Sequence, residues 1–220
     1  MKKTIILFFG PPGSGKGTQS DALGQKLNLP VISPGELLRH EEEKRTKLGL
    51  LVSKNLANGK LVSDSIIDKI LSARLVRPDA RRGFILDGYP RNKSQLEWLK
   101  KKIKRISKIE DKIIAIHINV SDREVKSRIG GRRVCDCGAA YHLKHNPPIH
   151  IGLCDLCGKK LKQREDDKPK IVKERLSHFR KSIKSIVGYF KKNYTFINVD
   201  GEQSIKAIEL EITKKINELK

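Results

Sequence analysis

Residues 4–16 constrain the fold more than any other part of this 220-residue chain. Thr4–Phe9 (TIILFF) is a continuous apolar run, typical of a strand buried on both faces of a parallel sheet. It is followed at once by GPPGSGK, residues 10–16, which fits the pattern G-x-x-x-x-G-K, and a helix is predicted over 18–27. Backbone N–H groups of such a loop and of the helix terminus form a nest for polyphosphate, to which Lys16 adds positive charge.

The rest of the chain alternates short apolar strands with helices. The predicted strands are 31–32, 84–86, 113–118 and 195–199, and the predicted helices are two short ones within 35–59, then 63–76, 92–102, 122–129, 171–191 and 204–219. This alternation predicts a mostly parallel sheet with right-handed crossovers. Ligands bind such sheets at the carboxyl ends of the strands, where both Gly10 and Asp87 fall.

Residues 132–167 interrupt this alternation and predict a small, loop-rich lobe. The segment holds all four cysteines of the chain, as Cys135-x-Cys137 and Cys154-x₂-Cys157, together with three of its six histidines. Two close pairs of thiolates suit a tetrahedral Zn²⁺ ion. Two alternatives remain open: disulfides, which a reducing cytoplasm disfavours, and buried cysteines without a ligand.

The charge and the apolar content limit the classes of protein that the chain can belong to. No apolar run approaches the roughly 20 residues that cross a bilayer, and the run at 4–9 ends without a cleavage site. We therefore expect a cytoplasmic protein. The net charge of +22 is compatible with a nucleic-acid partner, but the densest basic clusters, 99–108 and 159–164, lack the interleaved aromatic residues of a base-stacking surface. Lysines spread over solvated helices are the simpler interpretation.

Several separated motifs resemble those of the nucleoside monophosphate kinases and, among them, the long-lid adenylate kinases. GPPGSGKGTQ (10–19) resembles the family's phosphate loop; Gly17 stands where the general phosphate-loop motif usually has Ser or Thr. DGYPR (87–91) resembles the family's D-G-[FY]-P-R. Residues 131–133 (GRR) and 164–167 (REDD) resemble the two ends of the family's lid, and Arg175 matches a further arginine. The resemblance runs nearly from end to end.

This resemblance implies a set of site residues. The implied catalytic residues are Lys16, Asp87, Arg132, Arg164 and Arg175. Those implied for ATP binding are Gly13, Ser14, Gly15, Lys16, Gly17, Thr18, Arg128, Arg132, Tyr141 and His142. Those implied for AMP binding are Ser33, Pro34, Arg39, Lys60, Val62, Gly88, Arg91, Gln95, Arg164 and Arg175. Phosphoryl transfer suits such a set, because it depends on positioning and on positive charge spread over phosphate oxygens. Asp87 would orient waters on Mg²⁺.

Two positions depart from the family pattern. ISPGELLR, residues 32–39, carries Pro34 where these enzymes usually have a threonine that bonds the acceptor adenine, and proline offers neither a hydroxyl nor a backbone donor. The first cysteine pair is one residue shorter than the family's usual C-x₂-C. His142 or Asp155 could therefore replace one sulfur as a metal ligand.

The sequence thus predicts a three-layer α/β/α phosphate-loop kinase core with a five-stranded parallel sheet, formed by 1–32, 63–131 and 169–220. Residues 33–62 would be a helical insertion that binds the nucleoside monophosphate, and 132–168 a metal-stapled lid. By resemblance, the reaction is ATP + AMP ⇌ 2 ADP with Mg²⁺ in a monomer that needs neither nucleic acid nor membrane. The alternatives are a kinase for CMP, UMP or GMP and a basic protein that binds nucleic acid.

Overall fold

Five parallel strands form the central sheet of this computed structural model, in the order β2-β3-β1-β4-β7. The structure describes residues 2–44, 46, 49–50 and 62–219. Apart from two short strands described below, the elements are β1 (Thr4–Phe9), α1 (Lys16–Leu27), β2 (Val31–Ile32), α2 (Pro34–Glu43), α4 (Asp64–Leu75), η1 (Pro78–Ala80), β3 (Gly83–Asp87), α5 (Lys93–Ile106), β4 (Lys112–Asn119), α6 (Asp122–Gly131), η2 (Glu165–Asp167), α7 (Pro169–Asn193), β7 (Thr195–Asp200) and α8 (Ile205–Asn217).

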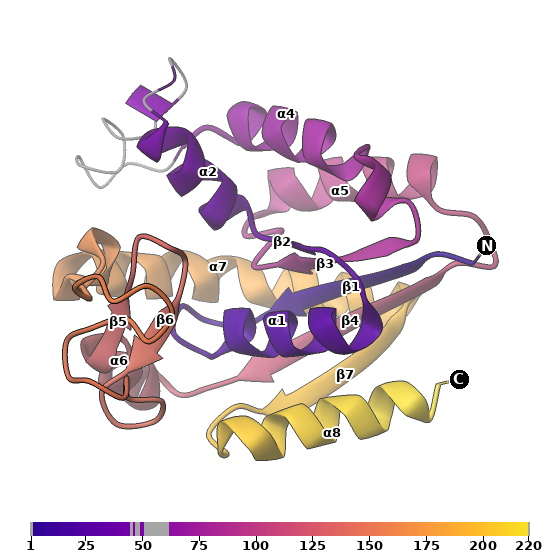
Figure 1. The fold of residues 1–220 in the computed structure, drawn as a ribbon. Coiled ribbons are helices and arrows are strands. Elements are labelled where there is room, and N and C mark those ends of the chain that lie inside the picture. The colour runs from indigo at the N-terminus through magenta and orange to yellow at the C-terminus, as the bar shows by residue number, and fades with distance from the viewer. Residues whose placement is uncertain (1, 45, 47–48, 51–61, 220) are drawn as a thin grey trace.

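Helices cover both faces of the sheet, so the molecule has three layers (Figure 1). Alternate residues of β1 enter opposite apolar clusters because successive side chains of a strand point to opposite faces. Ile6 and Phe8 pack with residues of α1, α6, α8 and the first half of α7, whereas Ile5, Leu7 and Phe9 pack with residues of α4, α5 and the second half of α7. The predicted α/β class and the five-stranded parallel sheet are confirmed.

β1 lies between β3 and β4, with Phe8 opposite Asp87 and Phe9 opposite His117. Its continuous apolar sequence follows from this position, since both of its edges and both of its faces are covered. The phosphate loop therefore begins at the carboxyl edge of the sheet, next to the end of β3 where Asp87 lies.

The lobe at 132–168 contains little regular structure, as predicted. It has one antiparallel pair of short strands, β5 (Arg132–Val134) and β6 (Ala140–His142). Its buried cluster consists of Cys135, Tyr141 and Cys154, with Ala139 and Leu161 packed against it. Figure 1 shows the lobe beside α6 at one end of the molecule, away from both chain termini.

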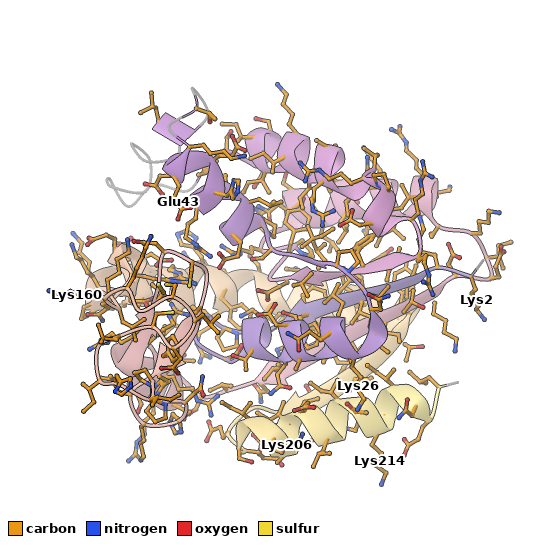
Figure 2. The ribbon with its side chains drawn as sticks, viewed as in Figure 1. Lys2, Lys26, Glu43, Lys160, Lys206 and Lys214 are labelled. Atoms are coloured by element: carbon orange, nitrogen blue, oxygen red, sulfur yellow. The ribbon has the colours of Figure 1, made fainter. Side chains whose placement is uncertain are left out.

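The sequence predicts that no segment spans a bilayer and that the lysines are spread over the solvated surface. Among the described residues, no helix combines the length and the apolar character that a bilayer span requires. Figure 2 shows Lys2, Lys26, Lys160, Lys206 and Lys214 on the outside of the molecule, distributed over the N-terminus, α1, the lobe at 132–168 and α8. The second of the two short helices predicted within 35–59 falls largely outside the described residues.

Candidate active site

The phosphate loop joins β1 to α1 through a series of tight backbone turns. Gly13 has φ 75, and a Cβ atom there would lie 2.7 Å from Cγ1 of Ile129 on α6, so only glycine fits. Gly15, with φ 87, is the N-cap of α1 and has no side chain that could cap the helix. The first N–H groups of α1 therefore remain available to an anion, as the motif predicts.

Lys16 and Asp87 lie at the mouth of this loop. The Lys16 ammonium donates to the carbonyl of Pro11 at 2.8 Å and lies 3.3 Å from Oγ of Ser14. Burial lowers the pKa of Lys16 from 10.5 to about 8; Asp87 opposes this shift, and nearby arginines add to it. Oδ1 of Asp87 is buried and accepts no hydrogen bond from the described residues. A buried carboxylate oxygen without a donor fits a role in holding waters on a divalent cation.

Arg39 and Arg91 form the side of the site that faces α2. Both guanidinium groups lie within 3.8 Å of the position that a Cβ on Gly35 would take. Arg91 donates through Nε to the carbonyl of Gly88 at 2.8 Å, and Arg39 forms an ion pair with Glu36. Burial lowers the pKa of Arg91, which Asp87 opposes and Arg39 reinforces. Two like charges held this close are expected where an anion binds between them.

Arg132, Arg164 and Arg175 come from the two ends of the lobe and from α7. Arg132 donates two hydrogen bonds to Asp167, whose side chain is fully buried. Arg175 donates to the carbonyl and the carboxylate of Asp166, both at 2.9 Å. These two carboxylates hold the guanidinium groups in place while leaving part of each exposed. We regard Asp166 and Asp167 as positioning residues.

Arg164 connects the lobe to α2. Its guanidinium lies 3.3 Å from Oε1 of Glu36, the same oxygen that pairs with Arg39. Burial alone would raise the pKa of Glu36, but its bonds to Arg39 and Arg164 lower it below its usual value. One carboxylate oxygen of Glu36 thus lies between two guanidinium groups, an arrangement that suits an anion.

Six predicted cations are therefore near one another at the carboxyl edge of the sheet. Lys16 lies close enough to Arg91, Arg132 and Arg175 for their charges to lower its pKa. Arg39 and Arg164 complete the set through Glu36. The set, which we call the cation cluster, consists of Lys16, Arg39, Arg91, Arg132, Arg164 and Arg175. Such a concentration of partly buried positive charge is suited to binding polyphosphate.

Apart from residues of the phosphate loop and the start of α1, three residues predicted to bind ATP lie outside the cation cluster. Arg128 on α6 is paired with Glu124 at 2.7 Å. Tyr141 is buried in the lobe, where its hydroxyl accepts a bond from the N–H of Asp155 at 2.8 Å and lies 3.6 Å from Sγ of Cys154. Nδ1 of His142 accepts two backbone bonds, and burial lowers the pKa of this imidazole. Their assignment to ATP binding stays a prediction. Of the loop residues predicted for ATP, Ser14 is buried and Thr18 is exposed.

The residues predicted for the acceptor base gather around the start of α2, α4 and α5. Pro34 is the first residue of α2 and its one buried residue, and Ser33 is the N-cap. Val62 is buried. Gln95 is only 4% exposed, and its amide bonds Asp64 and the backbone of Arg91. Lys60, also predicted, lies outside the described residues.

All four cysteines come together in the lobe. Their sulfur atoms lie within 4.8 Å of one another, with 3.4 Å between Cys135 and Cys157 and 3.5 Å between Cys137 and Cys154. Disulfide sulfurs would be about 2.05 Å apart, so the cysteines are not paired. Four sulfurs at bond lengths of about 2.3 Å from one ion would lie at such separations. The donor set therefore fits a tetrahedral metal, with sulfur in all four positions.

The short first pair reaches this geometry through a tighter turn. The N–H of Cys135 donates to the carbonyl of Ala139 at 2.9 Å, whereas the N–H of Cys154 donates to the carbonyl of Lys159, one residue further along, at 2.9 Å. A left-handed glycine follows the second cysteine of each pair, Gly138 with φ 95 and Gly158 with φ 70. The two turns therefore differ by one residue but both end in a left-handed glycine. Asp155 does not join the sulfur atoms and instead accepts a backbone bond from Ile149.

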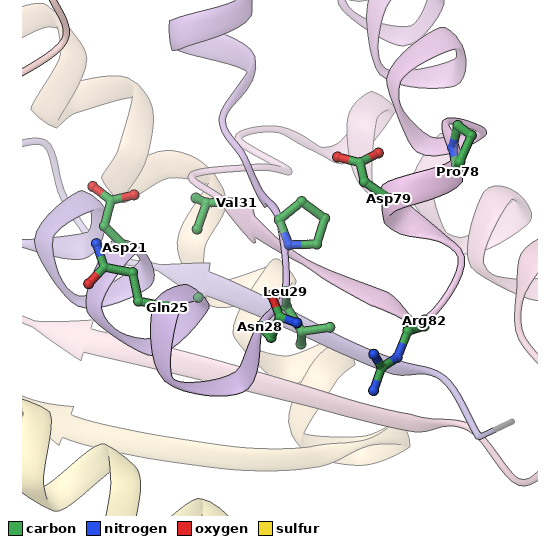
Figure 3. A pocket seen from close by; sticks show the side chains of 10 residues that line it. Asp21, Gln25, Asn28, Leu29, Val31, Pro78, Asp79 and Arg82 are labelled. Atoms are coloured by element: carbon green, nitrogen blue, oxygen red, sulfur yellow. The ribbon is translucent and has the colours of Figure 1, made fainter.

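A surface hollow of about 720 Å³ lies elsewhere, at the amino ends of β2 and β3. Figure 3 shows Asp21 and Gln25 of α1 on one side of it and Asp79 and Arg82 on the other. None of the predicted site residues lines this hollow. The cation cluster and not the hollow is therefore the candidate active site.

Sequence reasoning missed three carboxylates that organise the site. Asp64 follows Ser63, the N-cap of α4, and bonds Asn92 and Gln95, a role that no motif indicates. Asp166 and Asp167 were noted only as part of the motif at 164–167. Their position next to predicted phosphate-binding arginines was the available signal.

Comparisons with known proteins agree with this arrangement. A sequence model of the adenylate kinase family matches residues 8–195. The chain is 41% identical to an adenylate kinase of Methanocella arvoryzae over 97% of this chain and 99% of that protein. It is 38% identical to one of Archaeoglobus fulgidus, covering 98% and 99%, and 40% identical to one of Clostridium botulinum, covering 92% and 94%. With this family match and the phosphate loop, the chain belongs to the adenylate kinase family.

Proposed function

We propose that this protein catalyses the reversible transfer of the γ-phosphoryl group of ATP to AMP, which gives two ADP. The convergence of the cation cluster on the phosphate loop carries this proposal. The transferred group carries charge on several oxygens, and its transition state is stabilised mainly by positioned positive charge. The relatives at 38–41% identity, all named adenylate kinase, support the same reaction.

The roles of the cations follow from their positions. Lys16 and the loop N–H groups bind the donor's phosphates, and Arg39 with Arg91 binds the acceptor's phosphate beside Gly35 and Gly88. Arg132, Arg164 and Arg175 stabilise the charge on the group in transfer. Because Arg164 and Arg39 both contact Glu36, an entering phosphate replaces that carboxylate as their partner.

Mg²⁺ would be held through its waters by Asp87, whose buried Oδ1 lacks a donor among the described residues. When bound, the ion neutralises charge on the donor's phosphates. Residues 33–62 and 132–168 form the proposed acceptor-binding and lid domains around a core of 1–32, 63–131 and 169–220. Closure of the two domains would exclude water, which otherwise competes as phosphoryl acceptor.

The cysteine cluster is proposed to hold a structural Zn²⁺ ion. Its four sulfur atoms would fill the tetrahedral coordination shell of the ion, so no position stays open for substrate. We further propose that the protein acts as a cytoplasmic monomer that needs no nucleic acid.

ADP formation from ATP and Mg²⁺, compared for AMP, CMP, UMP and GMP at equal concentration, tests the proposal. Turnover with AMP far above the other acceptors is expected. Preference for another monophosphate would keep the mechanism but replace the acceptor, an alternative that Pro34 motivates. Salt-sensitive RNA or DNA binding without turnover by metal-loaded protein would overturn the proposal and favour a nucleic-acid-binding function for this basic chain.

A further inference from the structure

Two carboxylates on α4 hold the segment that carries Arg91. Oδ1 of Asp64 accepts from Nε2 of Gln95 at 2.7 Å and from Nδ2 of Asn92 at 3.1 Å. One turn further along α4, Asp68 accepts from the hydroxyl of Tyr89 at 2.8 Å. The two aspartates lie on one face of the helix, but only Asp64 bonds a residue that the family resemblance assigns to the acceptor base.

The bonds of Gln95 determine which way round its amide lies. Its Oε1 accepts from the backbone N–H of Arg91 at 2.7 Å, and its Nε2 donates to Asp64. A carboxylate can only accept and a backbone N–H can only donate. Rotating the amide by half a turn would therefore break both bonds and would place Oε1 of Gln95 against the carboxylate oxygen of Asp64. Gln95 is 4% exposed, so water would not replace the lost bonds.

Asn92 reinforces this orientation. Its Oδ1 accepts from the backbone N–H of Gln95 at 2.8 Å and caps α5, so its Nδ2 must face Asp64. Both amides thus direct their NH₂ groups at the same carboxylate. One N–H and one oxygen lone pair of Gln95 remain uncommitted among the described residues, and they too are fixed in position.

A fixed amide distinguishes two classes of base. Adenine and cytosine present an amino donor beside an acceptor ring nitrogen, whereas guanine and uracil present a keto oxygen beside a ring N–H. A freely rotating glutamine satisfies either class by turning over. An amide that cannot turn over accepts only one class of base when the acceptor nucleotide is held in a fixed position. In the proposed function Arg91 holds the phosphate of the acceptor. The backbone N–H of Arg91 donates to Gln95, so the anchor and the base-reading amide are directly connected.

We propose that Asp64 is a specificity-determining positioning residue that locks Gln95 to accept monophosphates with an amino-bearing base and to reject those with a keto base. The inference rests on the proposed function, because AMP as acceptor identifies the amino class as the one selected. Pro34 supports the inference, because at that position α2 offers neither a hydroxyl nor a backbone N–H to the base. Discrimination between bases therefore depends more strongly on Gln95.

The test compares Asp64→Asn with Asp68→Asn, a matched change one turn along the same helix. An asparagine at 64 can donate from one side of its amide, so the reversed Gln95 finds a partner, whereas an asparagine at 68 still accepts from Tyr89. kcat/KM is measured for AMP, CMP, GMP and UMP with saturating MgATP. We expect the wild type to prefer AMP over GMP by at least about a hundredfold, and Asp64→Asn to reduce this ratio about tenfold. Asp68→Asn should leave the ratio unchanged.

The outcomes bear differently on the inference and on the proposed function. An equal loss with all four acceptors in Asp64→Asn would give Asp64 a merely structural role and overturn the inference, while AMP turnover would still support the proposed reaction. Wild-type preference for CMP would replace the acceptor but support the lock. Preference for GMP or UMP would overturn both. Asp64→Ser, whose hydroxyl also donates or accepts, provides a second variant if melting curves show that Asp64→Asn is unfolded.

Discussion

The cation cluster lies at the edge of a sheet whose two faces are covered by extensive apolar clusters. The apolar cluster of the cysteine lobe, by contrast, consists of Cys135, Tyr141 and Cys154 with two partly buried neighbours. The first region has like charges brought close together on a rigid support. The second has ligands of one kind and almost no apolar core. We therefore expect that the cluster can lose a charge without unfolding, and that the lobe would lose its structure without the proposed metal.

Lys16→Met should produce the largest effect on activity. Removing the ammonium from the phosphate loop takes away charge that stabilises the transferred group, and kcat/KM should fall about a thousandfold. The melting temperature should stay unchanged or rise, because the buried charge contributes no apolar contact. Lys26→Met, on the exposed side of the same helix, is the control and should retain full activity. Activity of Lys16→Met near that of the wild type would contradict the proposed mechanism.

Removal of the proposed zinc should affect the lobe first and activity second. A chelator, or Cys154→Ser, should expose the amides of 132–168 to hydrogen exchange while those of β1 and β4 stay protected. Misplacement of Arg132 and Arg164 at the ends of the lobe should lower kcat about a hundredfold. Metal analysis of the intact protein should give one zinc per chain. Unchanged exchange in the lobe after metal removal would refute the claim that the metal stabilises it.

Asp167→Asn should remove a carboxylate that supports two arginines of the cation cluster. The fully buried carboxylate pairs with Arg132 and lies 3.8 Å from Arg175, so its loss leaves buried positive charge without a partner. We expect the free energy of unfolding to fall by about 3 kcal/mol and kcat by about tenfold. Denaturant unfolding and steady-state kinetics measure the two effects.

The lobe provides a contrasting ion pair for that experiment. Lys162 and Asp136 pair on its surface with both side chains more than half exposed. Asp136→Asn should leave the melting temperature and kcat unchanged, because solvent screens an exposed pair. Equal effects of the two substitutions would mean that burial does not distinguish the cluster from the lobe.

The two regions also differ in how much of them the sequence could predict. The strand at 4–9, its loop and Lys16 are contiguous, so their geometry follows from local rules of strand, turn and helix. The cysteine pairs indicated a metal, but not that the shorter turn at 135–139 still brings all four sulfurs together. That result depends on how the backbone bonds close around Gly138.

Long-range partners were the part that could not be predicted. Asp64 bonds Gln95 across 31 positions and Asp167 bonds Arg132 across 35, and no periodicity or motif indicates either pair. The resemblance assigns Tyr141 to the donor nucleotide, and no motif indicates that its hydroxyl also contacts Sγ of Cys154. Hydrogen bonds between elements depend on the tertiary packing, which a single sequence does not display.

The smallest predicted effect is a pH dependence that comes from Lys16. Its pKa is lowered to about 8, mainly by burial, so half of the free protein has lost this charge at pH 8. kcat/KM for MgATP should therefore fall about twofold between pH 7 and pH 8, because this parameter reports groups of the free enzyme. kcat should stay constant to a higher pH than kcat/KM, because bound phosphates favour the charged form of the ammonium.

Stability should depend on pH in the opposite direction. The pKa of Lys16 is lower in the folded protein than its ordinary value of 10.5, so between about pH 8 and 10.5 the unfolded chain binds more protons at this site than the folded one. The contribution of Lys16 to the free energy of unfolding therefore rises with pH across that window. Lys16→Met lacks this contribution, and the difference between its unfolding free energy and that of the wild type should shift in favour of the wild type from pH 8 to pH 10. If this difference in unfolding free energy stayed constant, the Lys16 ammonium would be as well solvated as one on the surface. The contrast between the cation cluster and the exposed charges of the lobe would then not hold for this residue.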